Sequence, residues 1–179
     1  MRIISGTHRG RVLHPPKSLP VRPTTDFAKE SIFNILNNHF EWEGLKVLDL
    51  FCGTGNISYE FASRGCSDII AVDTNFNCCE FVKRSATAFN MTQIKVMKSD
   101  VFSFLKKTAS TRHIIFADPP YDMEHMERIP ELVFERKLIK PEGWLIVEHG
   151  PHTNLSALPN FKEKRSYGNV NFSIFVQPL

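Results

Sequence analysis

Carboxylic acids stand at or near the ends of five short apolar runs in this sequence. The runs cover residues 46–51, 68–73, 94–100, 113–118 and 143–149, and their acids are Asp49, Asp73, Asp100, Asp118 and Glu148. A single acid in this position often caps the helix that follows. Several in succession predict an edge lined by ligand-binding carboxylates, because ligands of open parallel sheets bind outside the carboxyl ends of the strands.

The fourth run ends abruptly in the sequence IIFADPPYD, at residues 114–122. Neither Pro119 nor Pro120 has a backbone N–H, so the strand must stop at Asp118. A plain turn would also use these residue types. The neighbouring strand-end acids favour a site in which a carboxylate, two stiff residues and the ring of Tyr121 act together.

The first run leads into DLFCGTGNI, whose glycines Gly53 and Gly55 allow a sharp turn and close approach of a ligand. Ser58 stands where a dinucleotide fingerprint needs a third glycine, and no G-K-[ST] follows as in a P-loop. Asp49 would repel a phosphate and suit a cationic ligand such as S-adenosylmethionine. Asp73 could then accept hydrogen bonds from ribose hydroxyls. Asp100, beside the backbone of Val101, could accept from the adenine amine.

We therefore predict a set of cofactor-binding residues in and around these loops. Residues before the first long helix are included because that helix should cap the site. The set is Arg22, Thr24, Asp49, Phe51, Cys52, Gly53, Thr54, Gly55, Asn56, Asp73, Thr74, Asp100, Val101 and Asp118.

The order of the elements predicts an α/β fold. Segments of helical length separate most of the five runs, and this alternation indicates a Rossmann-like parallel sheet covered on both faces. Residues 162–177 read as two strands joined by a tight turn, so an antiparallel hairpin should complete a seven-stranded sheet. Residues 24–40 have helical periodicity, with N-cap candidates at residues 24–26. Residues 1–22 are predicted to form a β-hairpin arm, and residues 23–179 the main domain.

The N-terminal arm is basic. Five Lys or Arg residues precede the first acid, Asp26, in a chain of 179 residues whose formal net charge is only +3. Such a concentration of charge predicts a polyanionic partner, although it also fits a solvated basic tail. The four cysteines and seven histidines show no metal-ligand spacing, so we expect no metal. No signal peptide or run of about 18 apolar residues is visible, and we expect a cytoplasmic, monomeric protein that does not contact a membrane.

At this point the sequence resembles a known group of enzymes. VLDLFCGTGN together with IIFADPPYD is similar to motifs of S-adenosylmethionine-dependent methyltransferases that modify exocyclic amines. The segments RIISGTHRGRVLHPP and RPTTDFAKESIFNIL resemble the N-terminus of the RsmD family. The resemblance to this family covers nearly the whole chain. The resemblance implies methylation of the N2 amine of a guanine in small-subunit (16S) ribosomal RNA.

The resemblance also implies roles for the loop. Asp118 and the carbonyl of Pro119 would accept the two N–H groups of the amine, Pro120 would help to hold the loop stiff, and Tyr121 would stack on the base. Contacts with RNA are expected from Arg2, Arg9, Arg11, Arg22 and Tyr121. Arg22 and Thr24 could contact either cofactor or RNA.

Three alternatives differ from this interpretation. An adenine-N6 methyltransferase acting on DNA or RNA would suit the same loop, because both substrates present an amine. A non-catalytic RNA-binding module would keep the fold without binding S-adenosylmethionine. A nicotinamide dehydrogenase is disfavoured by Ser58 and leaves residues 118–121 unexplained.

Overall fold

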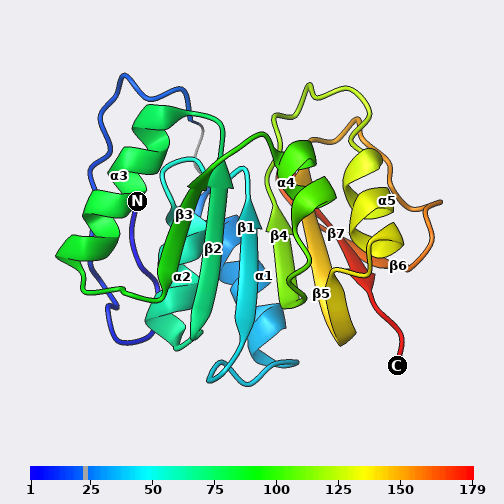
Figure 1. Ribbon diagram of the computed structural model, residues 1–179, viewed down its shortest axis with the longest axis horizontal. Helices are drawn as coiled ribbons and strands as arrows, with labels where there is room; N and C mark the ends of the chain where they lie inside the picture. The colour runs from blue at the N-terminus through cyan, green and yellow to red at the C-terminus, as the bar shows by residue number, and fades with distance from the viewer. Residues whose placement is uncertain (22–23) are drawn as a thin grey trace.

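A computed structural model describes residues 1–21 and 24–179 of the chain. It contains one seven-stranded sheet with helices on both faces (Figure 1), as predicted. The strands are β1 (Lys46–Leu50), β2 (Asp68–Asp73), β3 (Ile94–Lys98), β4 (Arg112–Ala117), β5 (Ile139–His149), β6 (Phe161–Tyr167) and β7 (Val170–Val176). The helices are α1 (Asp26–Asn37), α2 (Asn56–Arg64), α3 (Phe76–Ala88), α4 (Val101–Lys107) and α5 (Arg128–Glu135).

The strand order in the sheet is β3-β2-β1-β4-β5-β7-β6. Strands β1 to β5 pair in parallel, whereas β7 pairs antiparallel with both β5 and β6. The chain winds outward from β1 to β3 and then returns to place β4 on the other side of β1. The topological switch point therefore lies between β1 and β4, where open α/β sheets bind their ligands.

Each face of the sheet packs against its own helices. Apolar residues of α1, α2 and α3, such as Phe33 and Phe61, cover one face. Residues of α4 and α5, such as Leu105 and Ile129, cover the other. The central strands are buried on both faces, which explains why their sequences are nearly continuous apolar runs rather than alternating ones.

Local sequence explains how α1 and α2 begin. Thr25 caps α1, and its side chain accepts a hydrogen bond from the backbone N–H of Ala28. Gly55 precedes α2 with φ of 88°, and a Cβ there would lie 2.7 Å from Cζ of Tyr59. Both the backbone angle and the close ring require glycine at this position. The glycine loop therefore delivers α2 directly at the carboxyl end of β1.

Within residues 1–21, the part of the predicted N-terminal hairpin that the structure describes, one isolated antiparallel bridge forms, between Arg2 and Val12. Two of its backbone N–H groups, at Ile4 and Ser5, donate instead to the carboxylate of Glu60 on α2, at 2.9 and 3.0 Å. These two hydrogen bonds dock the N-terminal segment onto α2. The predicted boundary at residues 22–23 lies outside the described residues.

A buried lysine completes this docking. Lys29 of α1 is fully buried and forms an ion pair with Glu60 at 3.0 Å. Its ammonium group also donates to the carbonyl of Arg2 and to Oδ1 of Asn56, both at 2.8 Å. The lysine thus joins the N-terminal segment, α1 and the first residue of α2 into one polar network.

Candidate active site at the carboxyl ends of the parallel strands

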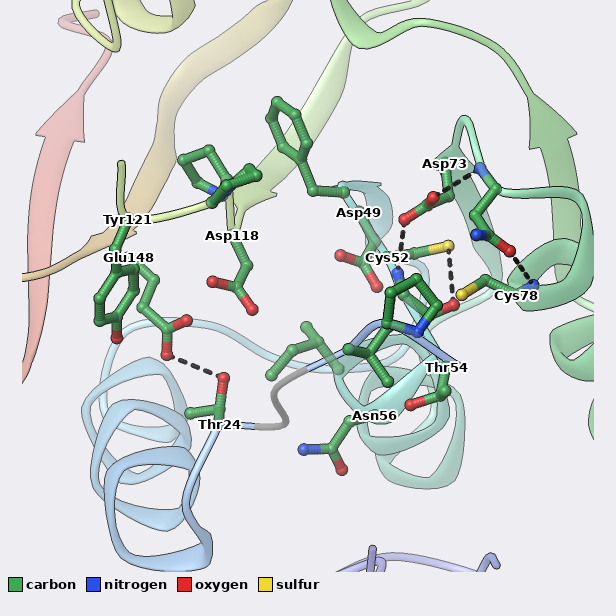
Figure 2. A pocket seen from close by; sticks show the side chains of 18 of the residues that line it. Thr24, Asp49, Cys52, Thr54, Asn56, Asp73, Cys78, Asp118, Tyr121 and Glu148 are labelled. Atoms are coloured by element: carbon green, nitrogen blue, oxygen red, sulfur yellow. Dashed lines mark hydrogen bonds between the residues drawn. The ribbon is translucent and has the colours of Figure 1, made fainter. Parts of the chain in front are cut away.

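A cavity of about 500 Å³ opens beside the switch point, within the size range of small-molecule sites. It lies at the carboxyl ends of β1, β2, β4 and β5, and Figure 2 shows the side chains that point into it. Its lining comprises Pro20, Val21, Thr24, Thr25, Asp49, Phe51, Cys52, Gly53, Thr54, Asn56, Ile57, Asp73, Thr74, Asn75, Cys78, Asp118, Pro119, Pro120, Tyr121, Glu148 and Val170. Most of the predicted cofactor residues and all four residues of the predicted catalytic loop are among them.

Register brings four acids to the same face of the sheet. Asp49 of β1 is paired with Ala71 of β2 and with Phe116 of β4. Residues two positions apart on a strand share a face, so Asp73 and Asp118 lie on the same face as Asp49. Phe116 is paired with Ile146 of β5, which puts Glu148 on that face as well.

Asp118 and Glu148 form a close pair at the ends of β4 and β5. Ala117 is paired with Val147, so these two acids are the next residues of adjacent strands. Their carboxyl groups lie within hydrogen-bonding reach of each other. Loss of hydration on burial raises the pKa of Asp118 well above its usual value, and the nearby carboxyls of Glu148 and Asp49 add to this effect. Burial beside two other carboxyl groups therefore disfavours the ionised form of Asp118.

Thr24 ties this acid pair to the segment before α1. Its hydroxyl donates to Oε1 of Glu148 at 2.8 Å, and the side chains of both residues are buried (Figure 2). Thr24 was predicted to contact cofactor or RNA, and the structure places it in the cavity wall. Arg22, predicted with it, lies outside the described residues.

Asp49 is buried beneath the glycine loop. Its Oδ2 accepts a hydrogen bond of 2.6 Å from the hydroxyl of Ser58. Burial raises the pKa of Asp49 to about 7, and the neighbouring Asp73 acts in the same direction, while the Ser58 hydrogen bond opposes it. Ser58 therefore replaces the third glycine of a dinucleotide fingerprint with a group that supports a carboxylate.

Asp73 organises the loop across the cavity. Its carboxylate accepts from the backbone N–H of Gly53 at 2.8 Å and from that of Asn75 at 2.9 Å. A carboxylate has about four acceptor sites, so capacity remains for the two hydroxyls of a ribose. Phe51 and Gly53 both have positive φ, of 60° and 53°, which gives this loop its sharp turn.

The glycine loop is also fastened to the N-terminal segment. The hydroxyl of Thr54 lies 3.1 Å from Sδ of Met1, and Asn56 accepts from Lys29. The predicted basic arm and the predicted cofactor loop are therefore in contact.

Three predicted cofactor residues that the structure describes do not line this cavity: Gly55, Asp100 and Val101. Gly55 is the N-cap residue of α2. Asp100 is exposed and caps α4, where its side chain accepts from the N–H of Ser103 at 2.9 Å. Val101 is buried in the core beneath α4. Asp100 therefore acts as a helix cap, the alternative role for a strand-end acid. It follows β3, which lies at the edge of the sheet.

The predicted catalytic loop, residues 118–121, is held in place by its surroundings. The N–H of Asp118 donates to the carbonyl of Leu50 at 3.2 Å, which anchors the loop to β1. Tyr121 packs against Gly150, where a Cβ would lie 3.0 Å from Cδ2 of the tyrosine ring. The small residue after β5 thus leaves room for this ring.

The sequence-based site set omitted several residues that line or support the cavity. Glu148 belongs to the row of strand-end acids, and that pattern alone could have placed it in the site. Ser58 and Gly150 act on residues far away in the sequence, so only the folded chain reveals their roles. Asn75 caps α3 and lines the cavity beside Asp73.

The cysteines do not suggest thiol chemistry. Burial raises the pKa of Cys52 well above its usual value and that of Cys78 to about 11. A thiol that stays protonated is a poor nucleophile. Cys52 and Cys78 therefore shape the cavity wall rather than react.

The predicted RNA contacts Arg2, Arg9 and Arg11 are all exposed. Arg2 lies 3.5 Å from Asp26, and Arg11 lies over the ring of Phe89. Neither contact buries its charge. No group of three or more potential metal-ligating side chains occurs among residues 1–21 and 24–179. Within the same residues, no helix is long and apolar enough to cross a membrane.

The chain is similar to proteins of one family. Residues 1–176 match the family described as "Conserved hypothetical protein 95". The YlbH protein of Bacillus subtilis (strain 168) is 32% identical over 182 residues, which cover 98% of each chain. Ribosomal RNA small subunit methyltransferase D of Escherichia coli (strain K12) is 28% identical over 178 residues, covering 98% of this chain and 89% of that protein.

Solved structures show the same fold. That of yhhF from Escherichia coli superposes with a TM-score of 0.88 at 24% identity, over 100% of this chain and 98% of the other. More distant structures with this fold are methyltransferases that contain S-adenosylmethionine or S-adenosylhomocysteine. The chain therefore belongs to the family described as conserved hypothetical protein 95, the RsmD family that its sequence resembles.

Proposed function

We propose that this protein transfers a methyl group from S-adenosylmethionine to the N2 amine of a guanine in small-subunit ribosomal RNA. Membership of the RsmD family makes it an S-adenosylmethionine-dependent methyltransferase. The observation that carries the substrate proposal is Asp118, held at the cavity by two prolines and followed by an aromatic ring. This loop presents acceptors to an amine, and the basic N-terminal segment beside it suits a polyanion.

The cavity offers the acidic groups and the open backbone that the cofactor needs. S-adenosylmethionine carries an activated methyl group on a positively charged sulfonium. The buried carboxyl of Asp49 offers negative charge to the cationic part of the cofactor. Asp73 offers its remaining acceptor sites to the ribose hydroxyls, while Gly53 and Gly55 allow the backbone close approach.

The remaining residues hold and orient the amine. Its lone pair is delocalised into the base, so the amine must be turned toward the methyl group. Asp118 and the carbonyl of Pro119 accept its two N–H groups, and both hydrogen bonds strengthen as the nitrogen becomes positive. The prolines fix these acceptors in advance, and such positioning can contribute up to roughly 7–11 kcal/mol in favourable cases. Tyr121 stacks on the base, which is worth about 1–3 kcal/mol.

The N-terminal segment supplies the RNA contacts in this proposal. Arg2, Arg9 and Arg11 extend from a segment that is bonded to both α2 and the glycine loop. Met1 of this segment contacts the glycine loop, whereas His8 bonds to Ser63 near the end of α2 and Arg11 lies over Phe89, after α3. RNA bound along the three arginines would therefore extend from the cavity toward the far ends of α2 and α3. Residues 1–22 thus act as an RNA-binding arm, and residues 23–179 as the catalytic domain.

Methyl transfer from tritiated S-adenosylmethionine tests this proposal. Naked rRNA and isolated small subunits, both from a strain lacking this gene, serve as substrates, and the labelled nucleoside is identified by chromatography. We expect label in N2-methylguanosine with at least one of the two substrates. Label in N6-methyladenosine would instead support the adenine-N6 alternative.

Absence of label from both substrates would overturn the proposal if the protein is folded and binds the cofactor. Absence of cofactor binding by calorimetry would favour the non-catalytic RNA-binding module. Asp118→Ala is the matched control, since it should bind the cofactor but transfer label at least about 10²-fold more slowly.

A further inference from the structure

The amine that this loop accepts occurs in two bases, and the neighbouring ring atom distinguishes them. In guanine, N1 beside the N2 amine carries a hydrogen and is a donor. In adenine, N1 beside the N6 amine has a lone pair and is an acceptor. A site that methylates only one of these amines can select its base by the group that faces N1.

Glu148 is the side chain next to the amine acceptor. It follows Val147, the partner of Ala117, so its carboxyl lies beside that of Asp118 and on the same face of the sheet. Figure 2 shows both carboxyls pointing into the cavity, with Tyr121 beside them. The N1–H and the nearer N2–H of guanine are parallel donors on one edge of the base. Two neighbouring carboxyls match that pair of donors.

Thr24 fixes the orientation of Glu148. Glu148 is 2% exposed, and the hydroxyl of Thr24 donates to its Oε1 at 2.8 Å. That hydrogen bond occupies one acceptor site of the Glu148 carboxyl group. One such bond leaves further acceptor sites on the carboxylate for a base.

We propose that Glu148 accepts the N1–H of the target guanine while Asp118 accepts its N2–H, so that Glu148 selects guanine against adenine. This inference rests on the proposed function and adds the residue that determines base specificity. Adenine in the same pose would turn its N1 lone pair toward a buried carboxylate. The result would be repulsion and an unpaired buried group, which sites built to hydrogen-bond their substrate reject strongly.

The inference is tested with rRNA that carries either guanine or 2-aminopurine at the methylated position. 2-Aminopurine keeps the amine at C2 but has an acceptor at N1. The position is first mapped with unmodified rRNA, and the substituted RNA is made by ligation and supplied both naked and as reconstituted subunits. We expect the wild-type protein to prefer guanine by about 10²-fold or more in kcat/KM. Equal use of both bases by the wild-type protein would overturn the inference without any variant.

Two variants separate base reading from a purely structural role. In Glu148→Gln, the amide can either accept from N1–H or donate to N1, so the preference for guanine should fall to within about tenfold. Thr24→Val removes the hydrogen bond to Glu148 but keeps the carboxylate, so it should retain most of the preference even if its rate falls. If Thr24→Val and Glu148→Gln lose the preference equally, Glu148 is only part of the scaffold.

The proposed function and this inference fail in different ways. If unmodified rRNA receives no methyl group on guanine N2, the proposed function fails and no position can be mapped. If guanine is methylated but the preference is unchanged in Glu148→Gln, only the inference fails. Cofactor affinity and thermal unfolding of each variant are measured in parallel. If a variant does not fold, the preference of the wild-type protein for guanine over 2-aminopurine decides the inference.

Discussion

Asp118 and Glu148 stand at adjacent register positions where β4 and β5 end, and their carboxyl groups face the same cavity. One is the predicted amine acceptor, and the other is held by Thr24 from the segment before α1. The pair connects the catalytic loop to the N-terminal part of the chain. Burial disfavours the ionised form of Asp118, and a cationic cofactor nearby would favour that form.

The role of Asp118 as an acceptor predicts different effects for two substitutions. Asp118→Ala should lower kcat by about 10²–10³-fold, because an acceptor that strengthens in the transition state is lost. Asp118→Asn should be far less impaired, since its amide oxygen can still accept an N–H of the amine. Single-turnover methyl transfer and calorimetry of S-adenosylmethionine check both variants, and cofactor affinity should change little. Equal loss in the two variants would mean that Asp118 must act as a base.

Because Asp49 is buried, its ionised carboxylate should destabilise the ligand-free protein at neutral and alkaline pH. Its pKa rises from 3.8 to about 7 on folding, so the folded state holds more protons than the unfolded state between about pH 4 and 7. Stability due to this group therefore falls as pH rises through that window. Asp49→Asn should increase the free energy of unfolding at pH 8, by at most on the order of 4 kcal/mol at about 1.4 kcal/mol per pKa unit, and much less near pH 4. Urea unfolding at both pH values checks this, and a less stable Asp49→Asn protein at pH 8 would contradict it.

The same substitution, Asp49→Asn, should weaken binding of the cofactor. An ionised Asp49 attracts the cationic ligand, whereas asparagine does not. Calorimetry at pH 8 should show lower affinity for S-adenosylmethionine in Asp49→Asn than in the wild-type protein. Unchanged affinity would remove Asp49 from the proposed cofactor site.

The basic segment predicts a salt-dependent RNA affinity. Arg9→Ala combined with Arg11→Ala removes two exposed charges and should reduce the slope of log K against log salt by about 1.4–1.8, the value for two phosphate contacts. Filter binding of rRNA over the range from about 50 to about 200 mM salt measures the slope, because affinity is expected to change strongly over this range. The matched control is Lys106→Ala with Lys107→Ala on α4, which covers the opposite face of the sheet. Equal slopes for the two double variants would argue against an RNA-binding role for the N-terminal segment.

The buried Lys29–Glu60 ion pair predicts a large loss of stability when only one partner is removed. Lys29→Met leaves the carboxylate of Glu60 without its buried partner, although Arg64 still contacts it. Breaking such pairs costs about 3–5 kcal/mol, and we expect a loss near the lower value in urea unfolding. The control is Lys83→Ala, which breaks an exposed pair with Glu80 and should cost about 1 kcal/mol or less. Similar costs for both variants would show that the buried network does not hold the N-terminal segment.

The sequence predicted the sheet well because parallel strands buried on both faces leave continuous apolar runs. All seven strands were expected, and the acids at the ends of β1, β2, β4 and β5 do meet at one cavity. Asp100 was assigned by the same pattern, but its strand lies at the edge of the sheet and its side chain caps a helix. Strand order, rather than residue type, decides which of these acids can reach a common site.

Contacts between distant segments could not be read from the chain. Residues 1–13 dock onto α2 through hydrogen bonds to Glu60, and nothing in the local sequence reveals that partner. The bonds of Ser58 to Asp49 and of Thr24 to Glu148 likewise join residues from different elements. Periodicity predicts elements, whereas the support of a site depends on how those elements pack.

Mass spectrometry of rRNA nucleosides from a deletion strain tests the central claim most directly. The small-subunit rRNA should lose N2-methylguanosine at one position, and the wild-type gene should restore it whereas the Asp118→Ala gene should not. Undiminished N2-methylguanosine in the deletion strain would contradict the assigned activity.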